Sequence, residues 1–90
     1  MPFGPHNPDD LSLREMARCK IETRKLPCAH QAHLYAGHGG GEMCAVCDFP
    51  IVPRQVLYEV ELELASFYFH LACHAAWQLE CAARDDSALA

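Results

Sequence analysis

The chain has 90 residues, six cysteines and a formal charge of −5, so it has room for one small domain and not for two independent cores. No stretch approaches the ~20 apolar residues of a membrane span, and the polar, proline-broken start is unlike a secretory signal peptide. We therefore expect a cytoplasmic protein with reduced cysteines and no membrane partner, in which a C-x2-C pair binds metal rather than forming a disulfide.

Charge is distributed unevenly along the chain. Residues 11–26 hold five basic side chains against two acidic ones, whereas residues 42–90 hold eight acidic side chains against two basic ones. The acidic half is not expected to attract nucleic acid over long distances. The basic residues within 14–25 keep nucleic acid open as an alternative partner.

The first two segments are a lead-in and a helix. Residues 1–8 contain three prolines and are expected to be disordered. A basic helix is predicted over residues 9–26, starting at Asp9–Asp10 or at Ser12 and stopped by Pro27. Its apolar and basic residues share one arc, so we expect a solvated helix packed loosely on the domain. The alternative is a basic, partly apolar face offered to a partner.

Residues 27–43 are predicted to be an irregular connector rich in glycine and histidine. Its glycines, which lie between positions 37 and 41, should let the chain approach the following turn closely. A backbone cradle for an anion is less favoured, because the lysine and the hydroxyl residue of a phosphate loop are missing. A second metal cluster is an alternative for this segment; its ligands would be Cys28, His30, His33 and His38.

Residues 44–84 carry the densest pattern. After Cys44 and Cys47, residues 56–62 alternate between apolar and polar, which predicts a half-buried strand. Residues 67–69 read as its returning partner, with a turn at residues 63–66. A helix is then predicted from about Phe69 or His70 to Arg84, and residues 85–90 form a frayed tail.

The predicted ligands are two pairs. Cys44 and Cys47 form a C-x2-C pair, while His70 and Cys73 form an H-x2-C pair in the first turn of the last helix. Zinc accepts thiolates and imidazole in a tetrahedral site, and sites with four protein ligands are usually structural. We therefore predict one structural Zn2+ bound by Cys44, Cys47, His70 and Cys73. Two alternatives stay open: His74 replaces His70, or both histidines bind and Cys73 does not.

The same helix has an apolar continuation below these ligands. At about 100° per residue, five side chains project from one side: His70, Cys73, His74, Trp77 and Cys81. Cys81 lies roughly 12 Å along the axis from Cys73, too far to bind the same ion. Cys81 and Cys19 are interpreted as small core residues. The other sides of the helix are also apolar, so the first helix or another chain should cover them.

The spacing of Cys44, Cys47, His70 and Cys73, with 22 residues between the pairs and Phe69 before the histidine, resembles the first half of a LIM domain. A LIM domain continues with another C-x2-C, where this chain has alanine and leucine. The resemblance implies a LIM-like treble clef with a single zinc: a knuckle, a β-hairpin and a helix. The longer pattern through residues 58–61 to the Phe-His-x-x-Cys-His-x-x-Trp motif is also similar to short uncharacterised bacterial zinc-finger-like proteins.

The predicted fold class is thus a small zinc-stabilised α+β domain, treble-clef-like and preceded by an N-terminal helix. A closed four-ligand site does not indicate an enzyme or a small-molecule substrate. The expected role is a protein interaction or regulatory module, binding a protein partner or itself. The alternatives are a nucleic-acid-binding, transcription-related zinc finger that uses the basic helix and, more remotely, a thiol redox protein that uses Cys44 and Cys47.

Overall fold

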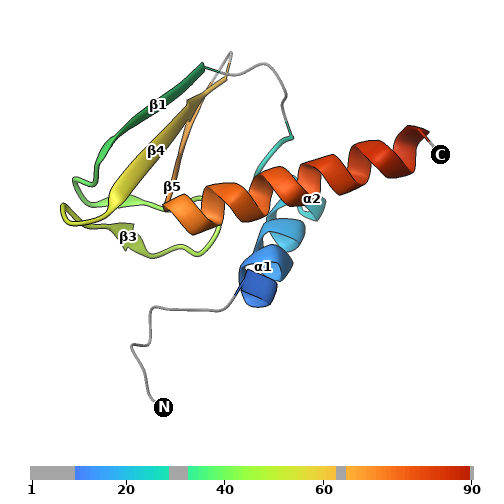
Figure 1. The fold of residues 1–90 in the computed structure, drawn as a ribbon, viewed down its shortest axis with the longest axis horizontal. Helices are drawn as coiled ribbons and strands as arrows, with labels where there is room; N and C mark the ends of the chain where they lie inside the picture. Colours follow the sequence, from blue (N-terminus) through green and yellow to red (C-terminus); the bar gives the residue numbers. More distant parts are fainter. Residues whose placement is uncertain (1–9, 29–32, 63–64, 90) are drawn as a thin grey trace.

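The computed structural model describes residues 10–28, 33–62 and 65–89. The elements, in chain order, are α1 (Asp10–Glu22), β1 (His33–His38), β2 (Glu42–Met43), β3 (Pro50–Ile51), β4 (Val56–Glu61), β5 (Ser66–Phe69) and α2 (Leu71–Leu89). Figure 1 shows α2 leaving the end of β5 and running past α1. The small α+β class is confirmed, whereas the expected lead-in at residues 1–8 lies outside the described residues.

The larger sheet has the strand order β1-β4-β5 and is antiparallel throughout. The strand predicted over residues 56–62 is confirmed as β4, whose register pairs Tyr58 with Phe69 and Val60 with Phe67. Its burial does not follow the predicted alternation, because Leu57 is buried and Val56 is exposed. One face of this sheet packs on α2, because Phe69 is fully buried and stacks on Trp77 with ring centroids 5.0 Å apart. The hydrophobic core therefore lies between this face and α2.

The first helix is docked on α2 and is not loosely packed. Leu13 and Ala17 are buried in the core, and Met16 and Ile21 pack against it. Glu80 of α2 accepts hydrogen bonds from two arginines of α1, which adds a polar link to this contact. The sequence predicted that either the first helix or another chain covers the apolar sides of the last helix. The structure shows that the first helix covers part of them.

The end of α1 corrects the prediction that Pro27 stops it. The helix ends at Glu22, and Arg24 adopts a left-handed conformation with φ of 63°. Arg24 N–H donates to the carbonyl of Ile21, and Lys25 N–H donates to the carbonyl of Lys20. These two bonds form a Schellman motif, which satisfies the last carbonyls of the helix before the proline is reached.

Two further predicted segments differ from the structure. Residues 27–43 were expected to be irregular, yet His33–His38 forms β1 because it pairs along its whole length with β4. Its glycine and histidines have weak intrinsic strand preference, so tertiary pairing decides the conformation. The backbone of residues 85–89 continues α2 where a frayed tail was expected. This tail contains no glycine or proline, the residues that would end a helix.

The structure describes two helices, α1 and α2. Neither α1 nor α2 combines the length and the apolar character needed to cross a membrane. The end of the sheet at which β5 passes into α2 brings His70 and Cys73 to the cysteine turn. The charged contacts between α1 and α2 lie farther along α2, at Glu80.

Candidate metal centre

Four predicted ligands come from two places in the fold. Cys44 and Cys47 lie in the turn between β2 and β3, which pair antiparallel as a short hairpin. His70 lies between β5 and α2, and Cys73 lies in the first turn of α2. The backbone links these places, since Ala45 N–H donates to the carbonyl of Tyr68 at 2.7 Å. The turn is therefore attached to the strand that leads into α2.

The four side chains converge. One ligand atom from each residue lies within 4.8 Å of the other three. Nδ1 of His70 is 3.4 Å from Sγ of Cys47 and 3.9 Å from Sγ of Cys73. Tetrahedral zinc, with Zn–S of about 2.3 Å and Zn–N of about 2.1 Å, would separate a sulfur from a nitrogen ligand by about 3.6 Å. The donor set and its spacing thus fit a tetrahedral ion.

The imidazole of His70 is oriented by a residue that sequence reasoning missed. Nε2 of His70 lies 3.1 Å from Oε1 of Gln55, which also accepts a hydrogen bond from the backbone N–H of Val52 at 3.0 Å. A proton on Nε2 leaves the lone pair of Nδ1 directed at the cysteines, as a metal ligand requires. No spacing pattern in the sequence identified Gln55.

The electrostatics of the cluster favour a thiolate. The Cys73 thiol donates to Sγ of Cys44 and backbone N–H groups in the turn also donate to it, which lowers the pKa of Cys44 to about 4. The pKa of Cys73 is raised because it donates to Cys44 and is buried. Burial is also the main reason that the pKa of Cys47 is raised. A metal ion binds deprotonated cysteines, so cation binding would release protons from this cluster.

Glycine at position 39 allows the chain before the turn to lie against residues 51 and 52, whereas the prediction was a close approach to the cysteine turn itself. A Cβ at Gly39 would collide with the backbone carbonyl oxygens of Ile51 and Val52. Gly39 N–H donates to the carbonyl of Gln55, and Gly41, at φ of 95°, donates to the carbonyl of Ile51. Gly39 and Gly41 therefore hold the chain before the turn against the chain that follows it.

His74 is placed away from this cluster. Its ring lies among three aromatic side chains, with ring centroids 5.0 Å from Tyr58, 5.5 Å from Phe69 and 5.7 Å from Trp77. Burial lowers the pKa of His74, so the neutral ring is favoured. The structure thus brings His70 to the cysteines and uses His74 in the core.

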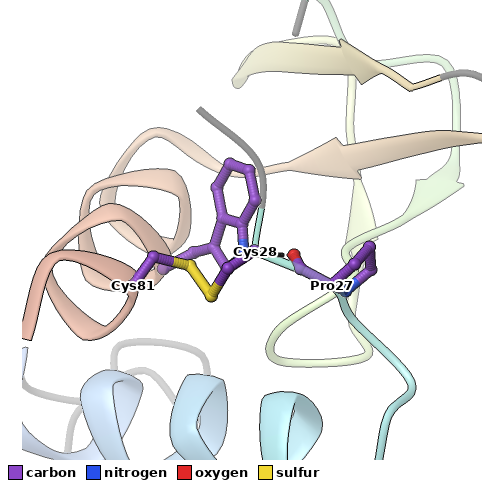
Figure 2. The surroundings of a disulfide bond; sticks show 4 residues. Pro27, Cys28 and Cys81 are labelled. Carbon is purple, nitrogen blue, oxygen red and sulfur yellow. Dashed lines mark hydrogen bonds between the residues drawn. A yellow bond between two sulfur atoms is a disulfide. The ribbon is translucent and has the colours of Figure 1, made fainter. Parts of the chain in front are cut away.

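Two cysteines depart from the sequence interpretation. Cys28 and Cys81 form a disulfide, with their Cα atoms 5.6 Å apart (Figure 2). The expectation that all cysteines are reduced is therefore wrong, whereas Cys81 lies in the core as expected. The bridge spans a sequence separation of 53, so local spacing gave no sign of it. Cys19 was also expected in the core, but it is exposed on α1.

The alternative second metal cluster is not assembled among the described residues. Cys28 is in the disulfide, while His33 and His38 lie at opposite ends of β1. His30 lies outside the described ranges. Within those ranges, the group of Cys44, Cys47, His70 and Cys73 is the one in which at least three metal-ligand side chains converge.

The basic residues of α1 are largely engaged within the chain. Nε of Arg14 lies 2.7 Å and Nε of Arg18 lies 3.2 Å from Glu80, whose side chain is 5% exposed. Nζ of Lys20 lies 2.8 Å from both carboxylate oxygens of Asp48 in the cysteine turn. Three of the five basic side chains of residues 14–25 thus have acidic partners in the same molecule.

An apolar groove of about 520 Å³ borders the cluster. Its lining includes Cys47, His70 and Cys73 and, beside them, apolar side chains from four parts of the chain: Leu13, Phe49, Pro50, Val52, Val56 and Leu71. Phe49, Val52 and Val56 are about 40% exposed, and Leu71 is 56% exposed. Large exposed apolar patches are characteristic of interaction surfaces.

Comparison with family models, with curated proteins and with solved structures gives no match to this chain. The class of protein is therefore defined by its own geometry. It is a small α+β domain with antiparallel sheets, two described helices and a Cys3His cluster close enough to hold a metal ion.

Proposed function

We propose that the chain is a zinc-binding protein in which one structural Zn2+ is held by Cys44, Cys47, His70 and Cys73. The observation that carries this proposal is the convergence of their ligand atoms within 4.8 Å. Three thiolates and an imidazole suit zinc, and four protein ligands complete its tetrahedral shell. The order of turn, hairpin and helix around the ion supports a LIM-like treble clef. We assign the domain no catalytic role.

The second part of the proposal is that the domain is a protein interaction module. The apolar groove supports this role, because Phe49, Val52, Val56 and Leu71 expose large apolar area beside the metal centre. Interaction surfaces are built around such apolar centres with a polar rim. Zinc would hold two walls of the groove together, since the turn and the start of α2 both contribute to its lining. The partner is another protein or a second copy of the chain.

Two other functions receive less support. Nucleic-acid binding through α1 would require Arg14 and Arg18 to exchange Glu80 for phosphates, and Lys20 to leave Asp48. Thiol redox chemistry at Cys44 and Cys47 would compete with metal binding, because both sulfurs point into the ligand cluster. DNA or RNA binding that weakens steeply with salt would favour the first alternative.

The metal part of the proposal is tested on the purified full chain. Elemental analysis is expected to give one zinc per chain, and a chelator is expected to remove helical and strand signal in circular dichroism. A fold that survives complete removal of the metal would reject a structural role. Protein that carries no tightly bound metal would reject the site itself.

The interaction part is tested with Leu71→Asp, which places a charge in the groove at the first residue of α2. Leu79→Asp is the matched control, because Leu79 is 53% exposed on the same helix and does not line the groove. Self-association is measured by mass in solution, and partners are measured by affinity capture. We expect Leu71→Asp to lose association while retaining zinc, and Leu79→Asp to behave as the parent chain. Equal behaviour of both variants would reject the groove as the interaction surface.

A further inference from the structure

Two links hold the segment of Pro27 and Cys28, which follows α1, against α2. The first is the Cys28–Cys81 disulfide (Figure 2), and the second is a hydrogen bond of 3.0 Å from the indole N–H of Trp77 to the carbonyl of Pro27. The residue before this segment, Leu26, is 1% exposed and belongs to the core. The segment therefore secures the end of α1, at the point where the chain leaves it.

The disulfide is separate from the candidate metal centre. Cys81 follows Cys73 by eight positions, which corresponds to about 12 Å along the axis of α2. Cys44, Cys47 and Cys73 are free thiols in the structure, so none of them takes part in the bridge. The two sulfur sites can consequently change their chemistry independently.

The two residues of the bridge differ in exposure. Cys28 is exposed, whereas Cys81 is 5% exposed. Thiol–disulfide exchange requires an incoming thiolate to reach one sulfur and to expel the other. Attack is therefore directed to Sγ of Cys28, and Cys81 is the leaving group.

We propose that the Cys28–Cys81 disulfide is a reversible clamp, opened by a dithiol reductant, that controls how firmly α1 is held on α2 while the metal centre stays intact. The first thiolate of the reductant forms a mixed disulfide with Cys28, and Sγ of Cys81 leaves with the electron pair and takes a proton. The second thiol of the reductant attacks its own bound sulfur and releases Cys28 as a thiol. Two electrons pass to the protein, and the reductant becomes a cyclic disulfide.

Opening the clamp changes what the surface presents. The remaining hold on α1 comes from buried Leu13 and Ala17 and from the pairing of Arg14 and Arg18 with Glu80. Those contacts open more often once the chain after α1 is no longer tied to α2, because local opening depends on the contacts that must break together. The reduced protein would then expose a basic helix, with the apolar side chains of Leu13 and Ala17, that the oxidised protein keeps packed.

The test uses the full zinc-loaded chain in mixtures of reduced and oxidised dithiothreitol with free Zn2+ present. Alkylation and mass spectrometry report the Cys28–Cys81 bond, elemental analysis reports zinc, and amide hydrogen exchange reports α1 and β4. Upon reduction we expect about tenfold or faster exchange within residues 12–21, unchanged exchange in β4, and one zinc retained. Unchanged exchange in α1, release of zinc together with the bridge, or an untreated protein without the bridge would each overturn the proposal.

Variants separate the clamp from general effects of reductant. Cys28→Ser combined with Cys81→Ser should show the fast exchange of α1 without any dithiol and should not respond to it. Cys19→Ser is the control, because this exposed thiol of α1 is outside both sulfur sites, and it should respond as the parent chain does. A response to dithiol that persists in the double variant would assign the effect to another group. The titration of the parent chain stays decisive even where the double variant folds poorly.

Discussion

The two regions that secure α2 rely on different chemistry. At its start, His70 and Cys73 join Cys44 and Cys47 in a cluster that a single ion can complete. In its middle, the hold comes from buried side chains, a disulfide and the paired charges around Glu80. The first region depends on one strong centre, whereas the second distributes its stability over several weaker contacts. A single change should therefore disable the first region and only weaken the second.

The largest effect is expected from replacing two ligands, Cys44→Ser with Cys73→Ser. Structural zinc sites have apparent binding energies of ~10–16 kcal/mol, comparable to or larger than the whole stability of about 5–15 kcal/mol of a typical domain. The variant should lose zinc and most of the β2–β3 hairpin and sheet. Elemental analysis and circular dichroism measure this, with Cys19→Ser as the control. A variant that keeps its full zinc content would refute the ligand assignment.

A smaller loss at the same centre is expected from Gln55→Leu. The change removes the acceptor for Nε2 of His70, and partners of this kind typically affect metal affinity by about 10–100-fold. Competition with a zinc chelator of known affinity measures the change. Gln78→Leu, at an exposed position of α2, is the control and should leave affinity unchanged. Equal affinity of Gln55→Leu and the parent chain would show that His70 is oriented by the fold alone.

The sequence predicted the metal-centre region well and the contacts in the middle of α2 poorly. The cluster, β4 and β5 were predicted because their signals are local: two ligand pairs with short spacing, and alternation over a few residues. The sequence left open whether His70 or His74 joins the cysteines. The fold decides this, since the aromatic neighbours that surround His74 come from β4, β5 and α2.

What the sequence did not reveal depends on distant segments meeting. The strand β1 forms through pairing with β4, the disulfide joins positions 53 apart, and Glu80 meets arginines more than 60 positions earlier. Six cysteines permit many pairings, and no local pattern distinguishes Cys28 with Cys81 from the others. The tertiary fold decides each of these contacts.

In the second region, Glu80→Gln should lower the free energy of unfolding by about 1–2 kcal/mol. Glu80 is buried and accepts from Arg14 and Arg18, but both guanidinium groups are partly exposed, which limits the effect. Urea unfolding of the zinc-loaded chain measures it. Glu15→Gln, at an exposed position of the same helix pair, makes the same charge change and should have little effect.

The pH dependence of this contact has a defined sign. Hydrogen bonds from Arg18 and Arg14 lower the pKa of Glu80 below its ordinary value of 4.5. A carboxyl group with a lowered pKa stabilises the fold above pH 4.5, and this contribution is lost as the pH falls through the lowered value. The difference in stability between the parent chain and Glu80→Gln should therefore be constant from pH 7 to about pH 5 and shrink below pH 4.5. A difference that grows on acidification would contradict this account.

The smallest effect is expected from Lys20→Met, which tests the separation of the two regions. Nζ of Lys20 contacts the carboxylate of Asp48, directly after Cys47, and so links α1 to the cysteine turn. Asp48 is 66% exposed on its side chain, and exposed ion pairs contribute about 0.2–1 kcal/mol. We expect a loss of stability of this size, no change in zinc affinity, and no effect of Lys25→Met. If Lys20→Met instead weakened zinc binding tenfold, the turn would depend on α1 for its geometry. The two regions would then be one cooperative unit, and opening the disulfide would be expected to disturb the metal centre.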